Sequence, residues 1–192
     1  VAEVLGDDLA AVRARIEDRS EFNPMLGHRG CRLGITFPEI TRMQATAILE
    51  ATAELLAEKV DARPEIMIPL VGTLKELTDQ KAIVLAVAAE VKRKYGLRKL
   101  PFSVGTMIEV PRAAITADEI ATEAEFFSFG TNDLTQMCCG FSRDDAGSFL
   151  PSYVEKKIYA DDPFISLDTA GVGKLMRIAV QLGRGARPDL KM

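Results

Sequence analysis

The chain has 192 residues, of which 47% are hydrophobic and 27% charged, and its formal net charge is −4. This composition is typical of a globular protein and excludes a disordered, collagen-like or disulfide-dense class. The acidic balance argues against nucleic acid as a partner, because that would require a basic stripe. No run of about 18 apolar residues occurs, so we expect no membrane span. Acidic residues within the first nine positions argue against a signal peptide.

Three cysteines and one histidine limit the chemistry. Cys31, Cys138 and Cys139 form an odd set without a CxxC pair, which predicts reduced thiols in a cytosol-like compartment, with a plastid or other organelle left open. We expect all three to be small buried hydrophobic residues. His28 is the only histidine, so no mechanism that needs two histidines can be built from this chain alone.

A first helix is predicted from Asp7 or Asp8, either of which can cap it, to about Glu21. Its apolar residues are spaced to form one face: Leu9, Val12 and Ile16. Residues 23–30 contain a proline and two glycines and interrupt the helical pattern.

A second helix is expected to start at Thr36 and to run to about Lys59. Thr36 and Glu39 have the spacing of a capping box, and Pro38 suits the first turn. The residues expected to face inward are Ile40, Met43, Ala47 and Leu55.

From residue 65 onward, strands and helices alternate. Residues 65–71 form an apolar run that predicts a buried strand ending at Gly72. Thr73 and Glu76 form a second capping box, and the helix that follows is expected to reach Tyr95, with Gly96 just beyond it.

The same alternation continues to the last residue. The later elements are a strand over 102–108, a helix over 112–122, a strand over 125–129, a long loop, a helix over 167–182 ending at Gly183, and the first residues of another strand at 189–192. Strict alternation predicts right-handed βαβ units and a parallel sheet.

The fold class is therefore α/β, and two architectures compete. Periodicity alone does not separate an open doubly wound sheet from a barrel. Neither GxGxxG nor GxxxxGK[ST] follows a strand, which disfavours a nucleotide-binding sheet. We therefore predict a (β/α)8 TIM-type barrel, incomplete because 192 residues fall short of the usual length of about 250. Residues 1–192 are expected to form one partial barrel domain.

Two neighbouring predicted strands end in carboxylates. Glu109 follows the strand at 102–108, and Asp133 follows Gly130, Thr131 and Asn132 after the next strand. Carboxyl ends of parallel strands meet at one edge, and two close carboxylates call for a cation or a proton between them. Mg²⁺ suits such a pair.

Simpler interpretations of these residues stay open. Either acid can be a helix N-cap, and Asn132 can be a turn residue. Gly130 can supply a positive φ or let a ligand approach the backbone.

Arginines form a second group. Arg29 and Arg32 lie in the glycine-flanked loop, and Arg143 follows Asp133 by ten positions. Arginine binds carboxylate and phosphate oxygens bidentately, although an isolated loop arginine is more often solvated or salt-bridged. His28 is interpreted as structural or as a hydrogen-bond donor to substrate.

Three motifs, in order, give the chain a resemblance that covers nearly its whole length. They are NPMLGHRGCRLG at 23–34, GTMIEVPRA at 105–113 and FSFGTNDLTQ at 127–136. Together they resemble the PEP/pyruvate-binding barrel of the PEP-utilising enzymes. Within that family the GHRGCRLG form and residues 141–164 look most like pyruvate, phosphate dikinases.

The resemblance implies roles for individual residues. Glu109 and Asp133 match the family's Mg²⁺ ligands, and Arg29 matches an arginine that binds the phosphoryl group and the enolate oxygen. Arg143 aligns with another phosphate-contacting arginine, and Asn132 with a residue at the PEP phosphate. Gly130 and Thr131 belong to the same substrate-binding motif. The expected ligands are PEP or pyruvate, with Mg²⁺ stabilising negative charge on the enolate and the transferring phosphoryl group.

The resemblance also implies parts that this sequence lacks. The TSHAA-like phosphohistidine motif, the ATP-grasp domain and the GxCGEHGGD-like segment with the acid/base cysteine are not in these 192 residues. We therefore expect the isolated chain to be inactive. The resemblance also implies that the full-length protein is a homodimer with a swivelling phosphohistidine domain. Three alternatives stay open: a PEP synthase or phosphotransferase-system enzyme I relative, a Mg²⁺-dependent citrate-lyase-type aldolase or lyase, and a non-catalytic folding or dimerisation unit.

Overall fold

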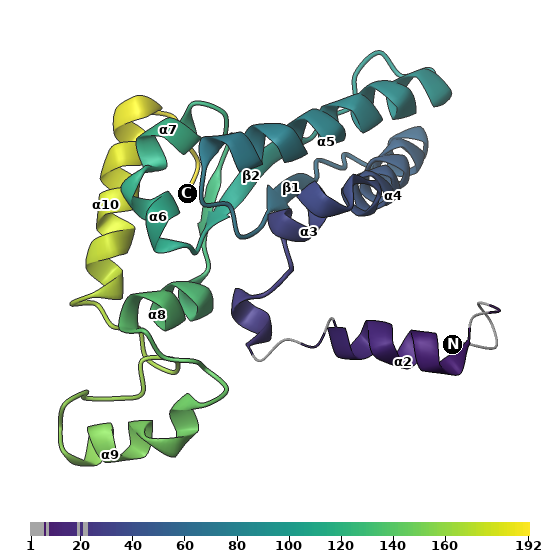
Figure 1. Cartoon of the computed structure of the whole chain (residues 1–192). Helices are drawn as coiled ribbons and strands as arrows, with labels where there is room; N and C mark the ends of the chain where they lie inside the picture. The colour runs from purple at the N-terminus through teal and green to yellow at the C-terminus, as the bar shows by residue number, and fades with distance from the viewer. Residues whose placement is uncertain (1–5, 7, 19, 21–22) are drawn as a thin grey trace.

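The computed structural model describes residues 6, 8–18, 20 and 23–192. Figure 1 shows helices arranged around a small sheet, with α2 lying apart from this body. The elements in chain order are α2 (Leu9–Asp18), the 3-10 helix η1 (Pro24–Leu26), α3 (Cys31–Thr36), α4 (Pro38–Ala57), β1 (Glu65–Ile68), α5 (Leu74–Lys94), β2 (Ser103–Ile108), α6 (Pro111–Ile115), α7 (Ala117–Ala121), β3 (Phe127–Phe129), α8 (Thr131–Cys139), the 3-10 helix η2 (Ala146–Ser148), α9 (Leu150–Glu155) and α10 (Val172–Ala186).

The strands pair in the order in which they occur in the chain. β1 pairs with β2 and β2 with β3, both in parallel, so that Ile66 lies opposite Val104 and Thr106 opposite Phe127. Lys191 then forms an isolated parallel bridge with Phe126. The predicted parallel α/β class is confirmed, and so is the extended segment expected at the end of the sequence.

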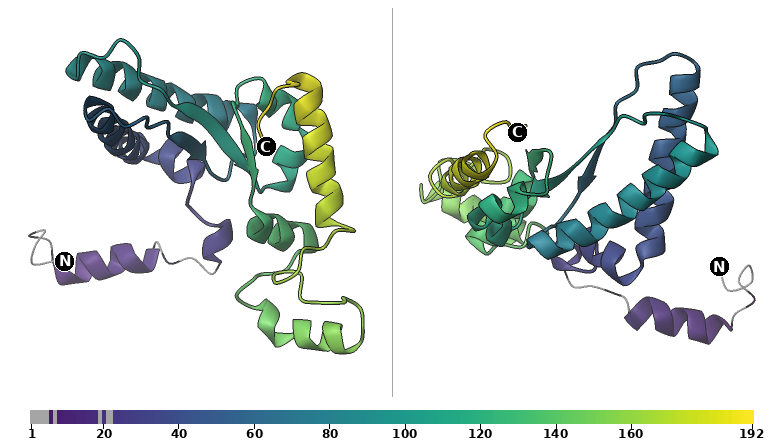
Figure 2. Two further views of the ribbon diagram at one scale, coloured as in Figure 1. Left: turned by 180° about the vertical axis from the view of Figure 1, so that it is seen from behind. Right: turned by 90° about the horizontal axis from the view of Figure 1, so that it is seen from above.

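Helices cover one face of this sheet. α4 and α5 pack together beside β1, and α10 packs on α6 and α7 beside β3 (Figures 1 and 2). The side chains of β1 that join the core are Ile66 and Ile68, whereas Glu65 and Met67 face the other way and are exposed. One-sided cover is consistent with a segment of a barrel wall. Closure into eight strands stays a prediction, because the sheet has three strands within the described residues.

An ion pair spans the face of the sheet that the helices leave open. Lys191 Nζ lies 2.6 Å from Glu65 Oε1, although Lys191 pairs beside β3 and Glu65 begins β1. Between them, the ring of Phe126 covers Gly105, where a Cβ atom would come within 2.5 Å of the ring carbons. A lysine beside β3 reaches a glutamate on β1 more easily when the sheet is curved.

The helix after β1 begins as its sequence predicts. The Thr73 side chain accepts a hydrogen bond from the Glu76 amide, and Glu76 Oε2 accepts one from the Thr73 amide at 2.8 Å. This capping box satisfies amides that the first turn leaves without helical partners. Tyr95 ends the helix, and Gly96 follows with φ of +62°, as expected.

The apolar face of α2 is buried at one of its three positions. Asp8 does accept a hydrogen bond from the Ala11 amide, so the expected cap is present. Val12 is buried, but Leu9 and Ile16 are 56% and 64% exposed because α2 lies apart from the body. Helical spacing places residues on one face but does not guarantee a surface that covers it. Asp7 and Glu21 lie outside the described residues.

The capping box predicted at Thr36 is also wrong. The N-cap of α4 is Phe37, and the Thr36 hydroxyl donates instead to the Arg32 carbonyl within α3. Of the expected inward residues, Met43, Ala47 and Leu55 are exposed and Ile40 is half-buried beside β1. The face that packs on the core is instead that of Ala45, Leu49, Thr52 and Ala53.

Three later boundaries also differ from expectation. The helix predicted over 112–122 is two helices, because α6 ends at Ile115 and α7 starts at Ala117. The predicted loop after β3 contains α8 and α9. The last helix starts at Val172, since the Asp168 side chain accepts hydrogen bonds from the amides of Gly171 and Val172. It runs past Gly183, where the absence of a side chain leaves room for the Phe127 ring. None of the helices in the described part of the chain has the length and apolar character that a membrane span requires.

Candidate functional site

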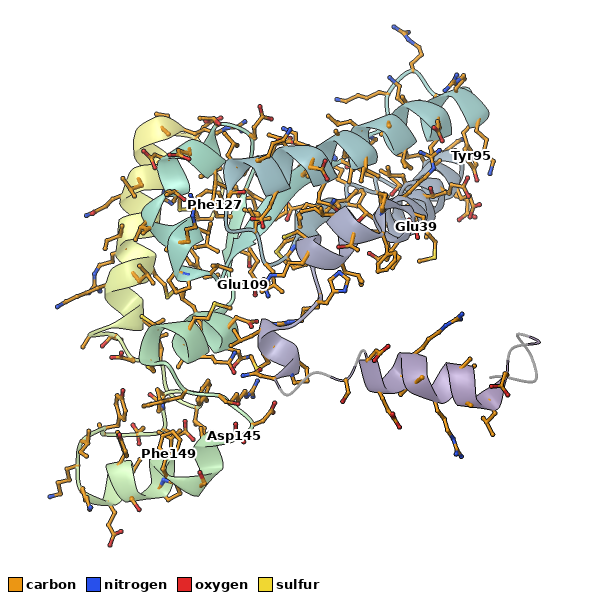
Figure 3. The ribbon with its side chains drawn as sticks, in the orientation of Figure 1. Glu39, Tyr95, Glu109, Phe127, Asp145 and Phe149 are labelled. Carbon is orange, nitrogen blue, oxygen red and sulfur yellow. The ribbon has the colours of Figure 1, made fainter. Side chains whose placement is uncertain are left out.

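Two buried carboxylates meet beyond the ends of β2 and β3. Glu109 directly follows β2 and is 4% exposed, and Asp133 lies in the first turn of α8 and is 7% exposed. Figure 3 shows Glu109 at the end of its strand. Neither acid caps a helix, because Val110 and Gly130 occupy the N-cap positions of α6 and α8. The helix-cap interpretation of both residues is therefore wrong.

Each oxygen of Glu109 has its own surroundings. Oε1 accepts a hydrogen bond from the main-chain amide of Leu70 at 2.7 Å. Oε2 lies over Gly130, where a Cβ atom would come inside 3.0 Å of Oε2 and lie 2.6 Å from Met107 Sδ. Gly130 has φ of −89°, so glycine is required here for space and not for a left-handed backbone.

The surroundings of Glu109 disfavour its charged form. Burial raises the pKa of Glu109 above its usual value, and the negative charge of Asp133 raises it further. The Leu70 amide and the Arg29 guanidinium act in the opposite direction. A carboxyl group whose ionisation is disfavoured by burial and by a neighbouring carboxylate attracts a cation or retains a proton.

Arg29 supplies the one cationic side chain that pairs with these acids in the described part of the chain. Its Nη2 forms an ion pair with Asp133 Oδ1, and its Nε donates to the Met25 carbonyl at 3.0 Å. Arg32 instead stabilises the loop, since its Nη1 donates to the carbonyls of Leu26 and Gly27. The glycine-flanked loop thus delivers Arg29, but not Arg32, to the carboxylates.

His28 and the remaining predicted residues lie at the margin of this site. The imidazole Nε2 of His28 lies 3.0 Å from the Thr36 hydroxyl, which fits a structural role. Thr131 and Asn132 are exposed at the start of α8, and the Arg143 side chain is exposed as well. Among the described residues, the structure joins Arg143 to the site through its main chain, by a 3.0 Å hydrogen bond to Gln136 Oε1.

Gln136 was not anticipated from the sequence. Its side chain is 2% exposed, one helical turn beyond Asp133, and its Nε2 is the one buried side-chain polar atom without a partner in the described part of the chain. The sequence offered one signal, because Asp133 and Gln136 are three positions apart and therefore share a face of α8.

Leu70 and Cys31 were also missed as parts of the site. Leu70 has φ of +59°, a conformation that costs a leucine about 1 kcal/mol. Cys31 Sγ donates to the Leu70 carbonyl at 3.2 Å. Burial raises the pKa of Cys31 to about 12, so the thiol stays protonated at neutral pH. Cys139 is half-buried, but Cys138 is exposed, which corrects the expectation that all three cysteines are buried.

The sequence is similar to a family of known proteins. Residues 7–187 match the family described as PEP-utilising enzyme, PEP-binding domain. The whole chain is 57% identical to pyruvate, phosphate dikinase from Clostridium symbiosum and covers 22% of that protein. It is 56% identical, again over its full length, to chloroplastic pyruvate, phosphate dikinase 1 from Arabidopsis thaliana, of which it covers 20%. Over 93% of the chain it is 56% identical to pyruvate, phosphate dikinase 2 from Zea mays, again covering 20%.

The chain thus spans about a fifth of the length of these curated relatives. Their names do not favour the synthase, phosphotransferase-system or aldolase alternatives. With the family match over residues 7–187 and the acid pair at the strand ends, the chain belongs to the PEP-utilising enzymes and corresponds to their PEP-binding domain.

Proposed function

We propose that this chain is the PEP- and pyruvate-binding part of a pyruvate, phosphate dikinase, the enzyme that converts ATP, pyruvate and phosphate into AMP, PEP and diphosphate. One observation carries the proposal. Glu109, Asp133 and Arg29 lie together beyond the strand ends, in a chain that is 57% identical to such an enzyme. The phosphoryl group would come from a phosphohistidine on a swivelling domain of the parent protein, which we expect to be a homodimer.

The residues present fit a Mg²⁺ ion. Both acids are buried, repel each other, and supply oxygen ligands, which Mg²⁺ prefers. No group of three or more His, Cys, Asp and Glu side chains that could hold a metal is found within the described residues, so Glu109 and Asp133 would share the ion with water and substrate oxygens. When bound, Mg²⁺ would stabilise the negative charge of the pyruvate enolate and of the transferring phosphoryl group.

The other residues act on the substrate in separate ways. Arg29 presents a fork of donors to a phosphate or enolate oxygen while its Nε stays anchored on Met25. Gly130 leaves room for Glu109 Oε2, and Thr131 and Asn132 expose the first turn of α8, where main-chain amides favour anions. We assign a phosphate contact to Arg143, which is exposed on the loop held by Gln136.

Titration of the full-length protein that carries this chain tests the proposal. Isothermal titration with Mg²⁺ and PEP should give binding that Glu109→Gln or Asp133→Asn weakens at least about tenfold. Glu58→Gln, which changes an exposed acid just after α4, is the matched control. Exchange of label between pyruvate and PEP distinguishes a dikinase from an aldolase. Unchanged affinity and turnover in both acid variants would overturn the metal assignment.

Activity of the isolated 192 residues is a separate question. The acid/base cysteine and phosphohistidine segments are not in this sequence, so we expect the isolated chain to form no PEP from ATP, pyruvate and phosphate. Detection of that product with the purified chain would contradict this expectation.

A further inference from the structure

The residue after β1 has an unusual backbone. Three described residues other than glycine have a positive φ, and two of them, Lys59 and Lys157, are exposed and follow the ends of α4 and α9. A left-handed residue is common just past a helix. Leu70 differs because it is 2% exposed, follows a strand and has φ of +59°. Some contact must hold it in this conformation.

The contacts that hold Leu70 come from the start of α3. The main-chain amide of Cys31 donates to the Pro69 carbonyl at 3.0 Å, and the Cys31 thiol donates to the Leu70 carbonyl at 3.2 Å. Gly30 lies against the same segment, since a Cβ atom there would be 3.1 Å from both Leu70 Cβ and the Pro69 carbonyl oxygen. Cys31 therefore donates hydrogen bonds to the peptide units on both sides of Leu70.

The held segment acts on Glu109. The amide of Leu70 donates to Glu109 Oε1 at 2.7 Å, while Oε2 lies over Gly130, the N-cap residue of the helix that carries Asp133. The Cys31 side chain is 1% exposed and belongs to the core, so it cannot reach substrate itself.

We propose that Cys31 is a positioning residue: by holding Leu70 in its left-handed conformation, it aims the Leu70 amide at one oxygen of Glu109 and leaves the other oxygen for the cation. This inference rests on the proposed function, because it presumes that Glu109 is a metal ligand. The thiol stays protonated and acts as a hydrogen-bond donor, not as a nucleophile.

The test uses Mn²⁺ as the probe, because its free concentration can be followed by electron paramagnetic resonance in the absence of turnover. In the full-length protein, Cys31→Ala removes the donor and should raise the Mn²⁺ dissociation constant about tenfold. Cys31→Ser retains a donor and should bind within about threefold of the original protein. Cys138→Ala, which removes an exposed thiol, is the control and should change nothing.

A purely structural role predicts a different pattern. In that case Cys31→Ala would lower the melting temperature without changing the Mn²⁺ dissociation constant, and the positioning role would be wrong. If Cys31→Ala is not recovered folded, Cys31→Val fills the site without a donor and replaces it in the comparison with Cys31→Ser. Equal affinities of the Val and Ser variants would then overturn the inference.

Two further variants separate this inference from the proposed function. Glu109→Gln and Asp133→Asn are titrated with Mn²⁺ in the same series. If these acid variants bind Mn²⁺ as the original protein does, the metal site is wrong, and the positioning role fails with it. If the acid variants lose Mn²⁺ and Cys31→Ala does not, only the role of Cys31 is wrong.

Discussion

Arg29 and Asp133 are 104 positions apart in the sequence and form an ion pair in which the arginine side chain is 40% exposed and the aspartate 10% exposed. The pair joins the loop before α3 to the first turn of α8. Arg29 thereby neutralises one of two adjacent carboxylates while one edge of its guanidinium stays open to solvent. A cation that binds Asp133 must compete with this arginine, whereas an anion can bind beside it.

This competition predicts opposite effects when Arg29 is replaced. Arg29→Met should leave the affinity for Mn²⁺ alone equal or higher, because a positive competitor for Asp133 is lost. The same variant should weaken PEP binding in the presence of Mn²⁺ about tenfold or more, since a bidentate donor is lost. Isothermal titration of the full-length protein measures both, with the exposed Arg13→Met as control. A loss of Mn²⁺ affinity in Arg29→Met would contradict the competition.

A methyl group at Gly130 should displace Glu109. The added Cβ would come inside 3.0 Å of Glu109 Oε2 and lie 2.6 Å from Met107 Sδ, so Gly130→Ala should weaken Mn²⁺ binding about tenfold. Gly147→Ala is the matched control, because nothing lies within 4 Å of its added Cβ. Equal Mn²⁺ affinities in the two alanine variants would exclude a role for the space over Gly130.

Alkaline pH should destabilise the fold through Cys31. Burial raises the pKa of this thiol from 9.0 to about 12, so the unfolded chain releases the proton first as the pH rises. The contribution to stability is complete below pH 9 and is lost as the pH rises toward 12, at about 1.4 kcal/mol per pH unit. Urea unfolding between pH 8 and about 10.5 should show a shallower decline for Cys31→Ser than for the original chain. Cys138→Ser, at an exposed thiol, should keep the original slope; parallel slopes for all three would refute the assignment.

Gln136 is expected to order the Arg143 loop without adding much stability. Gln136→Leu removes the 3.0 Å acceptor of the Arg143 amide but also removes a buried Nε2 without a partner. These effects oppose each other, so the free energy of unfolding should change by less than about 1 kcal/mol. Trypsin should nevertheless cleave after the exposed Arg143 several-fold faster. The exposed Gln44→Leu is the control, and equal cleavage rates would show that Gln136 does not hold the loop.

The sequence predicted the parts of the fold that depend on local chemistry. The capping box at Thr73, the glycine after Tyr95 and the parallel order of the strands all follow from short-range patterns. It also placed Glu109 and Asp133 together, because parallel strands end at one edge. The buried face of α4 was not predictable in the same way, since periodicity identifies an apolar face but not the surface opposite it.

The same distinction between local chemistry and packing applies to the residues of the site. Side chains with distinctive chemistry, such as Arg29, stand out in a sequence. The contribution of Leu70 does not, because its main-chain amide makes the contact and its left-handed conformation depends on Cys31, 39 positions away. Gln136 was hidden for a related reason: its burial is decided by how α8 packs, which the helix's own sequence does not specify.

The hydrogen bond from Leu70 to Glu109 has an evolutionary consequence. Every amino acid except proline carries a main-chain amide, so the donor to Glu109 survives almost any replacement at position 70. What restricts this position is φ of +59°, which glycine and asparagine tolerate better than leucine. Relatives can therefore vary the residue at this position and retain the contact, whereas changes at Cys31 or Gly30 would alter the backbone that presents it.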